Sequence, residues 1–173
     1  MGVRAERDDL PTIVAVGLLA YAAADIAHHV LGHRGACLTL GGHVRSLSSV
    51  YVDCSLRGAV IDLAGPFANL VAGLLAAVLG FRARGCARLF FALATEFNLF
   101  WFAGQLIYDA VTVKDDFGLP LMMLGSAPLA RYALAAVGLG LYRIAMRAVA
   151  RLLAPFGAAR TRRMALVARL TAG

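Results

Sequence analysis

Long apolar stretches are the feature that most constrains how this chain can fold. Four of them lie at 12–31, 59–81, 89–111 and 129–146. Each is close to the roughly 20 residues that a helix needs to cross a bilayer. Hydrophobic residues make up 61% of the sequence, well above the roughly 45–50% of soluble domains. We therefore expect an all-α integral membrane protein with about four transmembrane helices, in contact with membrane lipid and located in a bacterial cytoplasmic membrane.

The connecting segments add two structural expectations. Residues 34–56 contain a Gly41-Gly42 pair and a β-prone run at 49–52, so they predict a short β-hairpin-like loop between the first two spans. Residues 156–173 are basic and modestly amphipathic, which fits either an interfacial helix on anionic lipid or a partly disordered tail. The sequence thus divides into a membrane domain at 1–155 and a basic amphipathic tail at 156–173.

Charge is unevenly distributed between the two membrane faces. Four spans place both termini on one side, and most of the 17 Lys and Arg residues fall on that side. The positive-inside rule then favours cytoplasmic termini. Basic and aromatic residues do not interleave as on a nucleic-acid surface, so we expect no nucleic-acid partner. Cys37 and Cys54 share the first loop, where a disulfide in an oxidising compartment and two free thiols both remain open.

The histidines are the strongest sign of a functional site. All four fall between positions 28 and 43, at the end of the first span and in its loop. His29 and His33 are four residues apart, so on an α-helix they share a face and can hold one metal ion. His28 would point about 100° away from His29, so we expect it to pack or lie at the interface. Ionisable groups in a span are costly and by default indicate function.

Acidic residues should meet these histidines at the same membrane face, because the first and third spans both end there. Asp116 and Asp109 are the two candidates for a carboxylate ligand. Two histidines and one carboxylate are typical of catalytic zinc, with an open position for water. Asp25, one turn before His29, is expected either to accept the second ring N–H of His29 or to form a packing hydrogen bond.

The order of these motifs resembles the site-2 protease family of intramembrane zinc metallopeptidases. The segment His29-Val30-Leu31-Gly32-His33 stands where that family has H-E-L-G-H. Gly65-Pro66-Phe67-Ala68-Asn69 is similar to its Gly-Pro-x-x-Asn element in the next span. Asn98-Leu99-Phe100-Trp101-Phe102, followed by Asp116-Phe117, resembles its ligand-bearing segment. The resemblance covers about residues 20–120.

The resemblance implies a fold, a cofactor and a substrate. It implies one zinc ion held by His29, His33 and Asp116. It also implies that Asn69 and Asn98 line a cleft for a transmembrane peptide substrate or a membrane protein partner. The family's sites lie toward the cytoplasm, whereas the charge distribution of this chain places the site on the opposite face.

Position 30 departs from the family pattern. Val30 stands where the family has its general acid and base, a glutamate, and proton transfer by such a group is worth roughly 10²–10⁴-fold in rate. One interpretation is a metal-binding protein without proteolysis, acting as a scaffold or partner subunit. Another is a metallopeptidase in which Glu96 takes the catalytic role. Glu96 would, however, lie roughly 20 Å along its span from the membrane face at which the histidines lie. A third is different zinc chemistry on the same fold.

Overall fold

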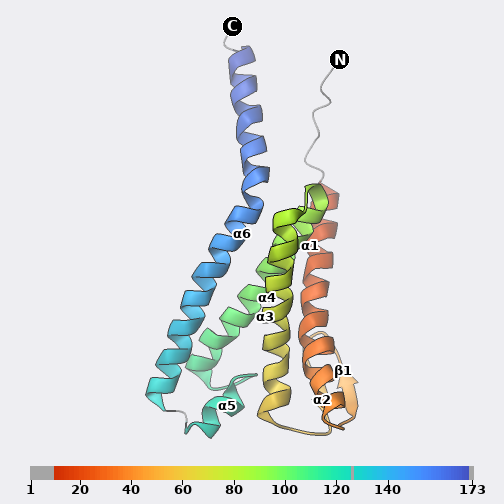
Figure 1. The fold of residues 1–173 in the computed structure, drawn as a ribbon, viewed down its shortest axis with the longest axis vertical. Helices are drawn as coiled ribbons and strands as arrows, with labels where there is room; N and C mark the ends of the chain where they lie inside the picture. The colour runs from red at the N-terminus through yellow and green to blue at the C-terminus, as the bar shows by residue number, and fades with distance from the viewer. Residues whose placement is uncertain (1–9, 126, 172–173) are drawn as a thin grey trace.

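Four long helices dominate the computed structural model, which describes residues 10–125 and 127–171 and the side chains as far as Gly157. The helical segments long and apolar enough to cross a membrane are Leu10–Thr39, Ala59–Arg82, Gly85–Thr112 and Pro128–Gly157. The start of the first and the end of the last lie at the same end of the bundle (Figure 1). The predicted all-α architecture with about four spans is therefore confirmed, and the protein is built as an integral membrane protein.

The first crossing is a continuous helical rod with an irregular middle. It consists of α1 (Leu10–Asp25), the π-helix η1 (Ile26–Arg34) and α2 (Gly35–Thr39). In a π-helix each N–H bonds to the carbonyl five residues back, which widens the turn, and such segments are frequent at functional sites. The sequence predicted a regular α-helix over 12–31, so the π-helical stretch is a difference that changes which side chains share a face.

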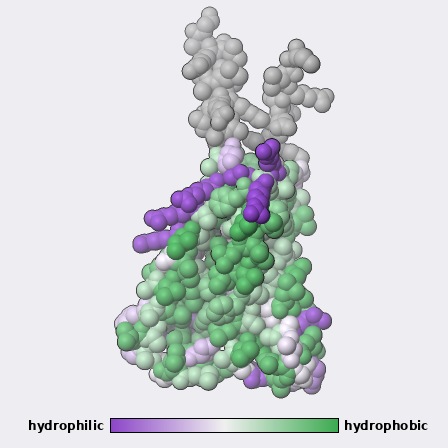
Figure 2. Space-filling model, viewed as in Figure 1, coloured by the Kyte–Doolittle hydropathy of each residue, from purple (hydrophilic) through white to green (hydrophobic). Residues whose placement is uncertain are grey.

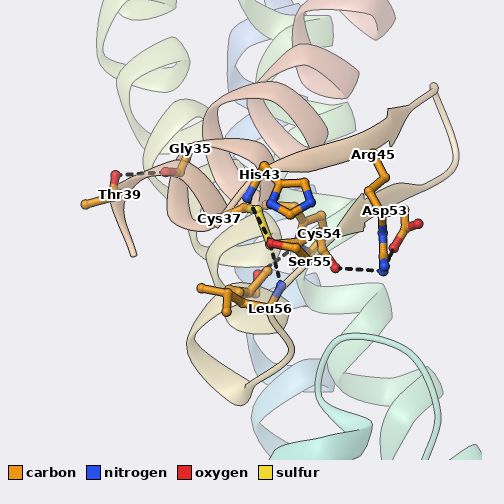
Figure 3. The surroundings of a disulfide bond; sticks show 11 residues. Gly35, Cys37, Thr39, His43, Arg45, Asp53, Cys54, Ser55 and Leu56 are labelled. Carbon is orange, nitrogen blue, oxygen red and sulfur yellow. Dashed lines mark hydrogen bonds and ion pairs between the residues drawn. A yellow bond between two sulfur atoms is a disulfide. The ribbon is translucent and has the colours of Figure 1, made fainter. Parts of the chain in front are cut away.

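The predicted hairpin follows this rod. Strands β1 (Val44–Leu47) and β2 (Val52–Cys54) pair antiparallel, with Val44 opposite Cys54 and Leu47 opposite Val52. The chain reverses at 48–51, while the Gly-Gly pair instead ends α2, where Gly41 has φ +83°. Cys37 and Cys54 form a disulfide that ties β2 to α2 (Figure 3). Of the two possibilities left open by the sequence, the disulfide is the one found.

The second crossing, α3 (Ala59–Arg82), approaches η1 so closely that glycine is required on both sides. A Cβ atom on Gly32 of η1 would lie 2.5 Å from the Cα atom of Gly65 in α3. A Cβ atom on Gly65 would overlap Nε2 of His33. Real Cβ atoms do not tolerate such contacts, so this pair of glycines sets how near α3 comes to the histidines.

The remaining helices complete the bundle. They are α4 (Gly85–Thr112), the short α5 (Gly118–Met123) and α6 (Pro128–Thr171). The α6 backbone continues as one helix through residues predicted to form a separate tail. The side chains from 158 onward lie outside the described residues, so the amphipathic tail and the 155/156 domain boundary stay predictions.

A proline interrupts the hydrogen bonding within α6. Pro155 has no N–H to donate to the Arg151 carbonyl. The Arg88 side chain of α4 donates to that carbonyl and to the Leu152 carbonyl.

Small side chains let the helices pack closely, and large apolar ones cover the outside. Ala20, Ala76 and Ala94 form a buried cluster between α1, α3 and α4, with phenylalanines from α4 against it. Apolar side chains cover much of the face drawn in Figure 2, with hydrophilic ones gathered toward its ends. Water would not favour such a surface, but a bilayer does, which agrees with the expected lipid contact.

Candidate metal centre

Three histidines of η1 converge at one end of the bundle. His28 and His29 are buried, with 2% and 5% of their surface exposed, and His33 is partly buried. One ring nitrogen from each lies within 4.8 Å of the other two. The π-helical turn accounts for His28, because it brings residues five apart onto neighbouring positions. The Nε2 atoms of His28 and His33 are thereby 3.0 Å apart. This group could hold a metal ion.

Asp116 adds a carboxylate to this group from the loop after α4. Its Oδ2 atom lies 3.2 Å from Nε2 of His28, and its Oδ1 atom lies 3.3 Å from Nε2 of His33. Gln105 of α4 donates from Nε2 to Oδ2 of Asp116 at 2.6 Å. Burial alone raises the pKa of the Asp116 carboxyl, but the hydrogen bonds to His28 and His33 outweigh it and leave the pKa below its usual range. The carboxylate is therefore ionised and available as a ligand.

A strained loop delivers Asp116 to the histidines. Val113 and Asp115 have φ values of +54° and +63°, and a β-branched residue such as Val113 rarely adopts this left-handed conformation. Asp109, the other candidate ligand, is fully buried, and its Oδ2 atom accepts a hydrogen bond from the Phe117 backbone N–H at 2.9 Å. Asp109 thus supports the loop, while Asp116 reaches the histidines. Strain of this kind persists where surrounding contacts hold it, often at functional sites.

Contacts behind the histidine rings fix their orientation. Nδ1 of His33 donates to the Ile61 carbonyl at 2.8 Å, which turns Nε2 toward Asp116 and His28. Nδ1 of His28 lies 3.2 Å from Nδ2 of Asn69. Trp101 stacks on the His28 ring with centroids 4.7 Å apart. Ligand histidines in metal sites are usually held by such partners.

His29 occupies a different position in the group. Its Nε2 atom lies 3.7 Å from Oδ1 of Asp25, which is too long for a hydrogen bond. Both ring nitrogens of His29 are buried without a hydrogen-bond partner among the described residues. Asp25 lies where the sequence predicted it, one turn before His29, but the predicted hydrogen bond between them is not formed.

The donor set has the chemistry and spacing to hold a metal ion such as zinc. Zinc binds histidine nitrogen and carboxylate oxygen at about 2.0–2.2 Å, and a tetrahedron of that size separates its ligand atoms by about 3.3 Å. The His28, His33 and Asp116 atoms are separated by 3.0, 3.2 and 3.3 Å. The nitrogens of His29 are buried and unpaired close by, which is unusual for polar atoms in a folded protein.

Of the other residues predicted for the site, the structure places only some beside the histidines. Asn69 contacts His28. Asn98 instead donates to the Ala94 carbonyl at 2.7 Å and lines a separate apolar groove of about 230 Å³. Glu96 is partly buried in α4 and is not among the residues that line the histidine pocket. The two asparagines expected in one cleft therefore lie in different places, and the roles predicted for Glu96 and Asn98 stay predictions.

A pocket of about 550 Å³ gives access to the histidines. The hairpin forms one wall through residues 49–52, and Trp101 and Gln105 of α4 form another. Sequence reasoning missed His28, Trp101 and Gln105 as parts of the site. A polar Gln105 inside a span was a visible signal, but nothing in the sequence indicated that it would face Asp116. The position of His28 depends on the π-helical turn, which has no clear sequence signature.

Comparisons with known proteins add no relative to this picture. The chain matches no protein-family model, no curated protein and no solved structure. The resemblance to site-2 proteases therefore rests on the motifs of the chain itself. The structure and sequence together describe an integral membrane protein with a group of histidines that could hold a metal ion.

Proposed function

We propose that this protein is a membrane-embedded zinc metallopeptidase of the site-2 protease type, with His28, His33 and Asp116 as its metal ligands. The observation that carries the proposal is the spacing of three ligand atoms at 3.0–3.3 Å in a buried site. His29 was the ligand that the resemblance implied, and the π-helical turn favours His28 in its place. The substrate class is a polypeptide segment at or in the membrane.

The chain supports this ligand set through its own contacts. The ring of His33 is already oriented to offer Nε2, because Nδ1 donates to a carbonyl. His28 needs Nδ1–H to donate when Nε2 binds a metal. Asn69 can accept that hydrogen bond, since turning its amide by half a rotation exchanges Nδ2 for Oδ1, which is buried without a partner. Gln105 holds Asp116 in either case.

Bound zinc would polarise a carbonyl group and lower the pKa of a bound water toward 7. The family's proton-transfer group is absent, because Val30 is apolar and partly buried at the position of the family's glutamate. Without that group, we expect hydrolysis to be slower by roughly 10²–10⁴-fold. The proposal is thus a weak hydrolase that has residues suited to hold the metal ion but lacks the family's acid-base glutamate.

A cleavage assay tests this function. The purified protein is incubated with a membrane-tethered reporter peptide, treated with a chelator and then reloaded with Zn²⁺. We expect slow cleavage that the chelator stops and zinc restores. His33→Ala should be inactive, while His43→Ala, which alters an exposed histidine outside the cluster, should retain activity. Cleavage that survives chelation, or no cleavage at all, would reject the peptidase.

Position 30 offers a sharper test. Val30 does not line the pocket, and the π-helical turn that brings His28 and His33 together leaves position 30 off their shared face. Val30→Glu should therefore leave turnover and zinc content unchanged, and Glu96→Gln should leave turnover unchanged because Glu96 does not line the pocket either. A rate raised by roughly 10²–10⁴-fold in Val30→Glu would show that position 30 faces the metal as the family's glutamate does. A lost rate in Glu96→Gln would return the catalytic role to Glu96.

A further inference from the structure

The two ends of the bundle differ in charge. Every aspartate in the described part of the chain lies in the half that contains the histidine pocket, where five cations accompany the six acids: Asp25, Asp53, Asp62, Asp109, Asp115 and Asp116, with Arg34, Arg45, Arg57, Lys114 and Arg131. The other half carries a set of arginines on α3, α4 and α6 and in the turn between α3 and α4: Arg82, Arg84, Arg88, Arg143, Arg147 and Arg151. Arginine-rich ends of membrane proteins lie in the cytoplasm, which places the pocket on the other side.

The cysteines give an independent indication of the same orientation. The Cys37–Cys54 disulfide lies at the base of the hairpin (Figure 3), and residues 49–52 of that hairpin line the pocket. Disulfides persist in oxidising compartments and are rare in the cytosol. Cys86, the remaining cysteine, is a free and exposed thiol at the start of α4, near the arginines. The paired and unpaired cysteines thus divide between the two ends as the charges do.

We infer that the histidine pocket opens on the extracytoplasmic side of the membrane and takes an extracytoplasmic polypeptide segment as its substrate. The orientation stands on the disulfide and the arginines, and the class of substrate rests on the proposed function. The site-2 protease resemblance implies the opposite orientation.

The rim of the pocket suits such a segment. Val50 and Tyr51, in the turn of the hairpin, are 82% and 53% exposed, and both line the pocket. They present an apolar and an aromatic side chain beside the entrance, where an extended chain can contact them from outside the bilayer. Arg57, Asp62 and Asp115 add charged groups to the same lining.

Thiol labelling with a membrane-impermeant maleimide tests the orientation. In the full-length wild-type protein, Cys86 reports on the arginine end. In a Cys86→Ser background, Ser49→Cys reports on the pocket rim, and Val50→Cys serves as a second probe should Ser49→Cys fail to fold. The native disulfide stays intact in all of them. We expect the rim cysteines to react in right-side-out vesicles and Cys86 to react only in inside-out vesicles. Any other pattern overturns the orientation.

Two further measurements separate this inference from the proposed function. Zinc content is determined on the same preparations, because a reversed labelling pattern with zinc retained overturns the orientation alone. Two membrane-tethered reporters carry the same cleavable sequence, one on the cytoplasmic side and the other on the extracytoplasmic side. We expect cleavage of the extracytoplasmic reporter only. Cleavage of the cytoplasmic one overturns the inference about the substrate while leaving the peptidase in place.

Discussion

The pocket end and the arginine end of this bundle differ in backbone regularity and in the polarity of their buried side chains. At the arginine end, regular helices pack through small apolar side chains such as Ala20, Ala76 and Ala94. At the pocket end, the chain has a π-helix, two non-glycine residues with positive φ, a disulfide and several buried polar groups. Such features cost stability where nothing compensates for them. Their concentration at one end indicates that this end was shaped for a ligand and the other for packing.

The largest effect should come from filling the contact between η1 and α3. Gly65→Ala places a Cβ atom on the His33 ring, so we expect zinc affinity to fall by about 100-fold or more and unfolding to become easier by about 1–3 kcal/mol. Zinc titration and thermal unfolding measure the two effects. Gly17→Ala is the control, because its Cβ meets nothing within 4 Å. Equal zinc binding by Gly65→Ala would mean that His33 is not a ligand.

Removing the disulfide should loosen the hairpin without emptying the metal site. Cys37 and Cys54 are 17 residues apart, and closing a loop of that length stabilises by about 3 kcal/mol. The double Cys37→Ser, Cys54→Ser variant should therefore show faster hydrogen exchange over 44–54 at unchanged zinc content, because the donors lie outside the hairpin. Cys86→Ser should change neither quantity. Loss of zinc in the double variant would show that the hairpin is part of the metal centre.

The two asparagines sharpen the comparison at single residues. Asn69 contacts His28, and removing a partner of a ligand histidine typically lowers metal affinity by about 10–100-fold. We expect that loss in Asn69→Leu. Asn98→Leu should keep the affinity, since Asn98 lines the apolar groove instead. Equal effects of the two substitutions, measured by zinc titration, would place both residues in one site, as the sequence resemblance implied.

The smallest effect concerns the strained loop. Val113→Gly removes a Cβ atom from a left-handed residue and should stabilise the protein by about 0.5–1 kcal/mol, after the entropy cost of glycine. Val111→Gly, at an exposed position inside α4, should destabilise by roughly 0.3–0.5 kcal/mol, the difference between the helix propensities of valine and glycine. Thermal unfolding distinguishes the two. A destabilised Val113→Gly would show that the loop is not strained at this residue.

The sequence was sufficient for the regular parts of the fold and for the region of the site. Apolar length predicted the spans, and turn composition predicted the hairpin, because both depend on local chemistry. The convergence of Asp116 with the histidines followed from counting spans. The position of His28 could not be predicted, because i and i+5 face one another only once the helix widens. The division between Asn69 and Asn98 depends on how α3 and α4 pack, which spacing along the chain does not specify.

Zinc content tests the central claim most directly. It is measured on the full-length protein purified without chelator and reloaded with Zn²⁺, for the wild type and for alanine variants of each histidine. We predict about one zinc ion per chain in the wild type and in His43→Ala, and almost none in His28→Ala or His33→Ala. His29→Ala should keep most of the metal, because His28, His33 and Asp116 supply the ligands. A wild type without stoichiometric zinc, or zinc retained when His28 and His33 are both replaced, would contradict the account.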